Sequence, residues 1–268
     1  MHYDPIKEKL GKFFNNSTSS RKLFYRLLDL LLLRTWHIHR EIKKWKKENP
    51  ANHEVLDAGC GFGQYSFWMG RKFSDFNIYA VDVKTDYLED CKSFFTKCGV
   101  NNVTFQTADL TKFSSDKKYN LVVCVDVMEH ILEDRDVFKN FHAAMQPNGM
   151  VLISTPSDQG GSDADDGEDE SFIGEHVRNG YNMDEIKEKL TTAGFSKVEA
   201  RYSYGTPGKI AWRLSMKYPI KMLNASKLFY ILIPFYYIPV YPICYILNYL
   251  DATGKHATGT GLIVKAWK

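Results

Sequence analysis

Three polar side chains stand close together in the stretch DVMEH, which follows the apolar run YNLVVCV. Glu129 and His130 lie three and four residues after Asp126, so one helical turn would bring all three to one face. An imidazole there could act as a general base toward a hydroxyl. Two carboxylates and an imidazole could instead hold a divalent cation, or Glu129 and His130 could simply orient the loop. We therefore take His130 and Glu129 as catalytic candidates, and all three residues as a weaker metal candidate.

A second group of functional side chains occurs in the stretch GEHVRNGY, residues 174–181. It contains His176, Arg178 and Tyr181 and follows an acidic, glycine-containing segment, which is typical of a loop. Catalytic and acceptor-binding residues are often carried on such loops. His176 is therefore the second candidate for a base or an acceptor contact. The alternative is a structural loop held in place by an ion pair between Arg178 and a carboxylate.

The stretch EVLDAGCGFG has glycine at every second position, at Gly59, Gly61 and Gly63, directly after a short apolar run. Glycine in a strand-to-helix turn lets a ligand approach the backbone. The spacing differs from the G-x-G-x-x-G of dinucleotide-binding turns, and the preceding Asp57 suits a ligand with a cationic amine and no pyrophosphate. Asp82 follows Gly63 by nineteen residues and ends the next apolar run, where a carboxylate could accept hydrogen bonds from both hydroxyls of a ribose.

Apolar runs alternate with segments of helical periodicity from residue 54 onward. We predict strands over residues 54–59, 77–82, 103–109, 119–126, 150–156, 195–205 and 259–267, and helices over 63–73, 85–99 and 182–194. The last of these helices has Asn182 as its N-cap and Gly194 at its C-terminus. Strands separated by helices favour a parallel sheet with helices on both faces. The predicted fold class is therefore α/β, doubly wound, with ligands at the carboxyl ends of the strands.

Five motifs, in order, resemble those of the class I S-adenosyl-L-methionine (SAM)-dependent methyltransferases, a family that includes the O-methyltransferases of quinone biosynthesis. They are VLDAGCGFG, YAVDV, TADL, LVVCVDVMEHI and MQPNGMVLIS, and the resemblance covers residues 50–202 and 257–268. It implies a Rossmann-like sheet of seven strands in the order 3-2-1-4-5-7-6, with strand 7 antiparallel. It also implies SAM as the cofactor and S-adenosyl-L-homocysteine as its product. The residues implied to hold the cofactor are Asp57, Gly59, Cys60, Gly61, Gly63, Asp82, Val83, Asp109, Leu110 and Asp126.

Charge is unevenly distributed, although the formal net charge is only +3. Residues 1–50 carry twelve basic and five acidic side chains, and residues 205–250 carry five basic ones and no acid. Within residues 21–47 the pattern predicts one amphipathic basic helix, with His37 and His39 as surface or capping residues. Basic segments favour an anionic partner, either a membrane or a nucleic acid. Nucleic acid is the weaker alternative, because an insert rich in Tyr, Pro and Ile is a poor phosphate-binding surface.

Residues 228–250 form a stretch of 23 residues without a charged side chain, between the last two predicted strands. Its length would suffice to cross a bilayer. A single crossing would leave the final strand on the wrong side of the membrane from its partner strand, and Pro234, Pro239 and Pro242 interrupt the stretch. We therefore expect a helical cap, inserted between strands 6 and 7, that covers the active site and rests on a membrane together with residues 21–47. A cap buried entirely in protein is the alternative.

These patterns divide the chain into a basic helical segment (1–50), a SAM-binding core (51–204), an apolar insert (205–256) and a final core strand (257–268). We expect a methyltransferase that acts on a lipophilic small molecule at a hydroxyl, such as a quinone precursor, a polyketide, a polyene or a lipid. The alternatives are transfer to carbon or nitrogen of a soluble metabolite, and a membrane-associated SAM-binding module without catalysis. Five cysteines without a CxxC pair, and an N-terminus without an apolar signal core, indicate the cytoplasm, including the inner face of a membrane.

Overall fold

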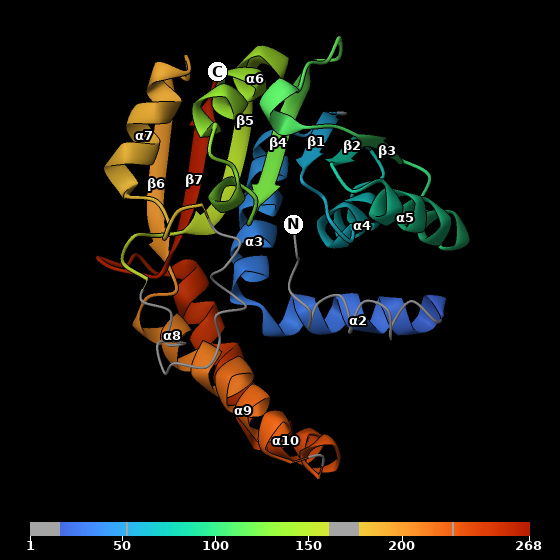
Figure 1. Cartoon of the computed structure of the whole chain (residues 1–268), viewed down its shortest axis with the longest axis vertical. Helices are drawn as coiled ribbons and strands as arrows, with labels where there is room; N and C mark the ends of the chain where they lie inside the picture. The colour runs from blue at the N-terminus through green and yellow to red at the C-terminus, as the bar shows by residue number, and fades with distance from the viewer. Residues whose placement is uncertain (1–16, 52, 161–176, 227) are drawn as a thin grey trace.

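The computed structural model describes residues 17–51, 53–160, 177–226 and 228–268. Its centre is a seven-stranded sheet in the order β3-β2-β1-β4-β5-β7-β6, which confirms the predicted strand order (Figure 1). β7 is antiparallel to its neighbours β5 and β6, and the other pairs are parallel. The strands are β1 (His53–Ala58), β2 (Phe76–Asp82), β3 (Val103–Thr107), β4 (Tyr119–Val125), β5 (Met145–Pro156), β6 (Lys197–Ser203) and β7 (Gly261–Trp267).

The strand order reverses between β1 and β4, because the chain runs outward from β1 to β3 and then returns to the other side of β1. These two central strands pair in parallel, with Val55 opposite Leu121 and Asp57 opposite Val123. At such a point the loops that follow the two strands diverge and leave room for a ligand at the carboxyl edge of the sheet. This edge is the lower one in Figure 1, and helix α2 (Thr18–Leu31) lies below it.

Helices cover both faces of the sheet and fill its apolar cores. On one face, α6 (Asp134–Ala144) and α7 (Met183–Thr192) contribute Phe138, Phe141 and Ile186, all fully buried. On the other face, α3 (Leu33–Glu48) buries Ile38 and Ile42 against the strands. Helices α4 (Gln64–Lys72) and α5 (Thr85–Lys97) pack on β2 and β3. The doubly wound α/β fold class is therefore confirmed.

The prediction of one helix over residues 21–47 is wrong, because the chain breaks at Leu32 into α2 and α3. Leu32 has extended backbone angles, with φ −88° and ψ 110°. The break lets α3 pack on the sheet while α2 turns across its carboxyl edge, which one straight helix could not do. The prediction that the two histidines are surface or capping residues is also wrong: His37 is fully buried, and His39 stacks on Trp68 with ring centroids 3.6 Å apart.

The segment between β6 and β7 forms two helical legs, which we call the insert hairpin (residues 206–253). One leg runs through α8 (Thr206–Trp212), the π-helical η3 (Arg213–Lys217) and α9 (Tyr218–Ala225), and α10 (Phe229–Thr253) returns along it. Both ends of the hairpin lie at the sheet, and its tip projects away from it (Figure 1). In the described part of the chain it is α2 that lies across the carboxyl edge, so the covering role that we expected of the insert falls to α2.

Candidate active site

The glycine turn after β1 is held by the neighbouring strand β2. The backbone N–H groups of Gly59 and Cys60 both donate to the carbonyl oxygen of Val81, at 2.8 and 2.9 Å. All three glycines of the turn have positive φ, between 50° and 78°, which other residues rarely adopt. A Cβ on Gly59 would lie 2.4 Å from a methyl group of Val127, whereas a Cβ on Gly61 would meet no atom within 4 Å. The turn thus packs closely against Val127 at Gly59 and is open at Gly61, where a ligand could approach the backbone.

Asp82 ends β2 directly beside this turn. One carboxylate oxygen accepts a hydrogen bond from the N–H of Gly61 at 2.8 Å, and the other accepts one from the N–H of Lys84 at 3.0 Å. The next residue, Val83, is 55% exposed. A carboxylate, an exposed apolar side chain and an open stretch of backbone therefore meet at the carboxyl edge of the sheet.

Asp109 and Leu110 follow β3 and lie alongside Asp82, because the N–H of Ala108 donates to the Asp82 carbonyl oxygen at 3.0 Å. Asp109 caps the short helix η1 (Leu110–Lys112), where its Oδ1 accepts from the N–H and the hydroxyl of Thr111 at 2.9 and 2.7 Å. These hydrogen bonds hold the pKa of Asp109 below its usual value. Leu110 is buried beneath the loop. The structure thus brings the second and third motifs together.

Asp57 lies inside the protein, beneath the glycine turn. Only 2% of its surface is exposed, and its Oδ2 accepts a hydrogen bond from the Ser66 hydroxyl on α4 at 2.6 Å. Burial raises the pKa of Asp57 to about 6, with a further contribution from the charge of Asp82. Burial also raises the pKa of the neighbouring Cys60 thiol. Because its observed partner is Ser66, a contact between Asp57 and a ligand amine stays a prediction.

Asp126 follows β4 and has a left-handed backbone conformation, with φ 53°. Its N–H donates to the Ser154 carbonyl oxygen on β5 at 2.9 Å, and its carboxylate forms an ion pair with Arg34. The N–H of Arg34 donates in turn to the Tyr204 hydroxyl at 3.1 Å, and burial raises the pKa of Tyr204 to about 12. Sequence reasoning missed both partners. The available signal for Arg34 was a single basic residue directly after four leucines.

Glu129 and His130 belong to the short 3-10 turn η2 (Met128–His130). Glu129 is 2% exposed and accepts a hydrogen bond from the Thr155 hydroxyl at 3.2 Å. Burial, together with the charge of Asp126, raises the pKa of Glu129 to about 8. His130 is half-buried, and its backbone N–H donates to the Val127 carbonyl oxygen at 3.0 Å. In the described ranges no group of three His, Cys, Asp or Glu residues could hold a metal ion, so the metal interpretation of this trio gains no support.

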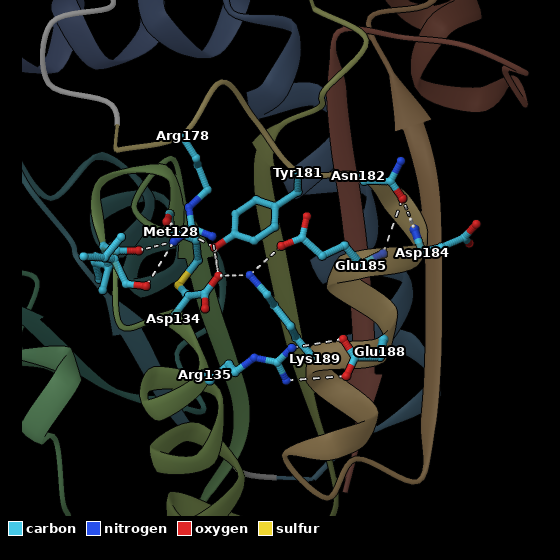
Figure 2. A network of polar contacts seen from close by, with 12 residues as sticks. Met128, Asp134, Arg135, Arg178, Tyr181, Asn182, Asp184, Glu185, Glu188 and Lys189 are labelled. Atoms are coloured by element: carbon cyan, nitrogen blue, oxygen red, sulfur yellow. Dashed lines mark hydrogen bonds and ion pairs between the residues drawn. The ribbon is translucent and has the colours of Figure 1, made fainter.

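The second histidine candidate, His176, lies outside the described residues, but the loop that follows it is described. The N–H of Val177 donates to the Glu129 carbonyl oxygen at 3.0 Å. Arg178 forms an ion pair with Asp134, and the Tyr181 hydroxyl donates to the same carboxylate at 2.7 Å (Figure 2). This agrees with the structural alternative, in which an arginine–carboxylate pair holds the loop.

Helix α2 packs over the glycine turn. The hydroxyl of Tyr25 and the guanidinium of Arg21 both donate to the carbonyl oxygen of Phe62, the latter at 3.0 Å. The amide of Gln64 donates to the Asp29 carboxylate at 2.8 Å, and burial raises the pKa of Asp29 to about 6. Helix α2 is therefore part of the site.

The chain is similar to methyltransferases in sequence and in fold. A family model described as a methyltransferase domain matches residues 21–200. The chain is 31% identical over 102 residues to a ubiquinone biosynthesis O-methyltransferase of Rickettsia felis, a match that covers 38% of this chain and 41% of that protein. It is 28% identical over 162 residues to phosphoethanolamine N-methyltransferase 1 of Triticum aestivum, which covers 58% of this chain and 30% of that protein. The chain thus spans less than half the length of these two curated relatives.

A solved structure extends the similarity to most of the fold. It is that of phosphoethanolamine N-methyltransferase 2 of Haemonchus contortus in complex with S-adenosyl-L-methionine. The TM-score is 0.60 at 17% identity, and the match covers 86% of this chain and 52% of that one. At this identity the match shows a common fold.

Proposed function

Because the chain belongs to the class I SAM-dependent methyltransferases, we propose that it transfers a methyl group from SAM to a hydroxyl of a lipophilic small molecule. The observation that carries the proposal is the meeting of the open glycine turn, the Asp82 carboxylate and the exposed Val83 at one edge of the sheet. Each of these features has a counterpart in SAM: its amino-acid part, its ribose hydroxyls and its adenine ring.

The residues around the glycine turn fit this cofactor. The turn from Gly59 to Gly63 would receive the amino-acid part without interference from side chains, because its open side is bare backbone at Gly61. Asp82 would accept hydrogen bonds from the ribose, Val83 would pack on the adenine, and Asp109 would accept from its amino group. SAM supplies a methyl group on a positively charged sulfur. A nucleophile attacks the methyl carbon in line with the carbon–sulfur bond, and S-adenosyl-L-homocysteine leaves. What the chain adds is position and exclusion of water.

His130 is the proposed general base for the acceptor hydroxyl. It is half-buried on η2, at the carboxyl end of β4 and four residues after Asp126. Glu129 has a different role, because it is buried and accepts a hydrogen bond from Thr155. With a pKa of about 8 it is protonated at neutral pH, so we assign it to positioning η2. His176 is the alternative base.

A lipophilic acceptor is supported by the exposed apolar side chains of α10 and by the Rickettsia felis relative, whose name places it in ubiquinone biosynthesis. We propose that the acceptor is reached from a membrane, with contacts through residues 205–250 and 21–47 at its cytoplasmic face. The Triticum aestivum relative is named for methylation of nitrogen in phosphoethanolamine, and this makes transfer to nitrogen the chief alternative.

Cofactor binding and turnover are tested separately. The Asp82→Ala variant should bind SAM about a hundredfold more weakly, because two hydrogen bonds to a charged group are lost. Asp86→Ala, which removes an exposed carboxylate on α5, is the matched control and should bind normally. Unchanged affinity in Asp82→Ala would disprove the assigned cofactor site. His130→Ala should keep SAM binding and lose turnover, and normal turnover would transfer the role of base to His176.

The acceptor is sought with methyl-labelled SAM and an extract of the source cell, partitioned between organic solvent and water. Label in the organic phase is the expected result and provides the product for mass spectrometry. Label in the aqueous phase alone would identify a polar acceptor and contradict the lipophilic class. A protein that binds SAM and labels nothing would instead be a binding module without catalysis.

A further inference from the structure

The insert hairpin presents an apolar face that the described protein leaves exposed. By length and composition α10 could cross a membrane, yet only 6% of its most apolar stretch is buried in the protein. Cys244 and Asn248 lie on its buried side. On the other side five large apolar residues are between 51% and 70% exposed, namely Ile231, Phe235, Ile238, Ile243 and Ile246. A continuous apolar face of this kind marks an interaction surface.

The prolines of α10 indicate how deep this face can lie in a membrane. Pro234, Pro239 and Pro242 are all on the exposed side of the helix. Proline has no N–H, so the carbonyl groups four residues earlier in the chain lose their helical partners. Such carbonyls are costly in the hydrocarbon core, where water does not reach them, but are solvated at the membrane–water interface. The prolines therefore favour a shallow position over a crossing.

The other leg of the hairpin supplies positive charge. Lys209, Arg213, Lys217 and Lys221 recur at intervals of four along α8, η3 and α9, which sets them along one side of the leg. Residues 205–250 contain five basic side chains and no acidic one, so this part of the chain has a net positive charge. An apolar helix beside a basic one matches the boundary between acyl chains and anionic headgroups.

Hydrogen bonds fasten the two legs to each other. The hydroxyl of Tyr236 donates to the Leu214 carbonyl oxygen at 2.8 Å, and that of Tyr237 donates to the Ser215 carbonyl oxygen at 2.5 Å. Both acceptors lie in the π-helical η3. The two legs therefore form one unit.

The root of the hairpin is tied to the rest of the protein by Asp251, which is fully buried. Its carboxylate accepts from the N–H groups of Tyr204 and Gly208 at 3.1 and 3.0 Å, and pairs with His37 of α3 at 2.9 Å. Tyr204 also contacts Arg34, the partner of Asp126. The hairpin therefore has a defined orientation. Two residues, Tyr204 and Arg34, connect its root at Asp251 to Asp126 of the site.

From these observations we propose that the insert hairpin docks on a lipid membrane with anionic headgroups. The exposed face of α10 lies in the acyl boundary, and the bases of the other leg lie among the headgroups. This deepens the proposed function, because it names the surface through which a lipophilic acceptor is reached, but it does not depend on which atom is methylated. A second copy of the chain would also cover the apolar face, but it would bring together two segments that each carry a net positive charge.

Vesicle flotation of the full chain tests the proposal. Vesicles of phosphatidylcholine mixed with phosphatidylglycerol should bind the protein more tightly than phosphatidylcholine alone, and added salt should reduce the difference. Ile231→Ser and Ile238→Ser should each weaken binding about tenfold. Leu132→Ser is the matched control: Leu132 is 69% exposed, close to the 70% of Ile238, but lies outside the hairpin. It should bind vesicles as the unmodified chain does.

Three results would overturn the proposal. The first is vesicle binding that neither isoleucine substitution weakens. The second is a dimer without lipid that Ile238→Ser converts to a monomer, which would make a second copy the occupant. The third concerns depth: the fluorescence of Ile238→Trp should be quenched more by lipids brominated near the headgroup than by lipids brominated at the chain end, and the reverse order would indicate a crossing. SAM affinity and methyl transfer to a detergent-dispersed acceptor should stay normal in these variants, so a failure of docking is distinguishable from a failure of the proposed function.

Discussion

Two buried carboxylates follow β4 only five residues apart, and their surroundings differ sharply. Asp134 is 3% exposed and meets Arg178, Lys189 at 2.7 Å and the Tyr181 hydroxyl at 2.7 Å (Figure 2). Glu129 is 2% exposed and has the Thr155 hydroxyl as its side-chain donor, with the like charge of Asp126 nearby. Nearly equal burial therefore accompanies opposite electrostatic surroundings.

The comparison shows that partners, not burial, decide the charge of these two groups. Burial alone would raise the pKa of Asp134, but Lys189, Tyr181 and Arg178 hold it below its usual value. Burial raises the pKa of Glu129 to about 8, and no comparable group of cations opposes it among the interactions described. Asp134 is therefore ionised at neutral pH and connects α6, α7 and the loop at 177–181. Glu129, beside the site, has a pKa close to neutral pH.

The largest effect is expected at Asp134. Asp134→Ala would leave Arg178 and Lys189 without their shared carboxylate, and should lower the free energy of unfolding by about 3–5 kcal/mol. Denaturant titration measures this loss. The stability that Asp134 contributes should be present at neutral pH and disappear as the pH falls through its lowered pKa. A loss below about 1 kcal/mol would contradict the anchoring role.

Glu129 should show the opposite dependence on pH. Between its ordinary pKa of 4.5 and its value of about 8 in the protein, the folded state keeps a proton that the unfolded state has lost. Stability should therefore fall as the pH rises through this window, by about 1.4 kcal/mol for each unit of pH. Glu129→Gln should remove this slope and be more stable than the unmodified chain at pH values near 8. Parallel curves for the two proteins would show that Glu129 is ionised throughout.

The ion pair between Arg34 and Asp126 should contribute less to stability than the contacts of the buried Asp134, because about a quarter of each of its side chains is exposed. Arg34→Met should lower the free energy of unfolding by about 1–2 kcal/mol and, by removing a positive charge, raise the pKa of Glu129 further. The pH dependence of stability should then extend to higher pH. Arg26→Met, which removes an exposed charge from α2, is the control and should change neither quantity.

The smallest effect is expected at another ion pair between α6 and α7, that of Arg135 and Glu188 (Figure 2). Arg135 and Glu188 are 3.1 Å apart, but their side chains are 48% and 59% exposed. Water screens such a pair, so Arg135→Ala should leave the unfolding midpoint essentially unchanged. A clear loss of stability would mean that an exposed ion pair stabilises the protein as the buried Asp134 does. Burial and several partners would then not explain the contribution of Asp134.

Local patterns in the sequence were sufficient for the glycine turn and for the cap of α7, where the Asn182 side chain accepts from the N–H of Asp184 at 2.9 Å. The strand order was implied by the resemblance of five motifs to a known family, and the structure has that order. They were not sufficient where the partner is distant in the chain. Arg34 and Asp126 are 92 residues apart, and His37 and Asp251 are 214 apart. The break at Leu32 has the same origin, because packing on the sheet and across its edge overrides a continuous helical pattern. Cofactor motifs are local, whereas the partners that tune the site are long-range.

The position of β7 has a consequence for synthesis of the chain. β6 is an edge strand, joined to the sheet through β7, and β7 is made after the whole insert hairpin. While the ribosome extends the chain, the apolar α10 is therefore complete before the sheet can close around residues 261–267. During that interval the contacts of Asp251 with His37, Tyr204 and Gly208 can already form, but the sheet beside the hairpin is unfinished. If the insert hairpin docks on a membrane as proposed, a nearby bilayer would cover α10 of the nascent chain during this interval, and translation beside membranes should raise the yield of folded protein.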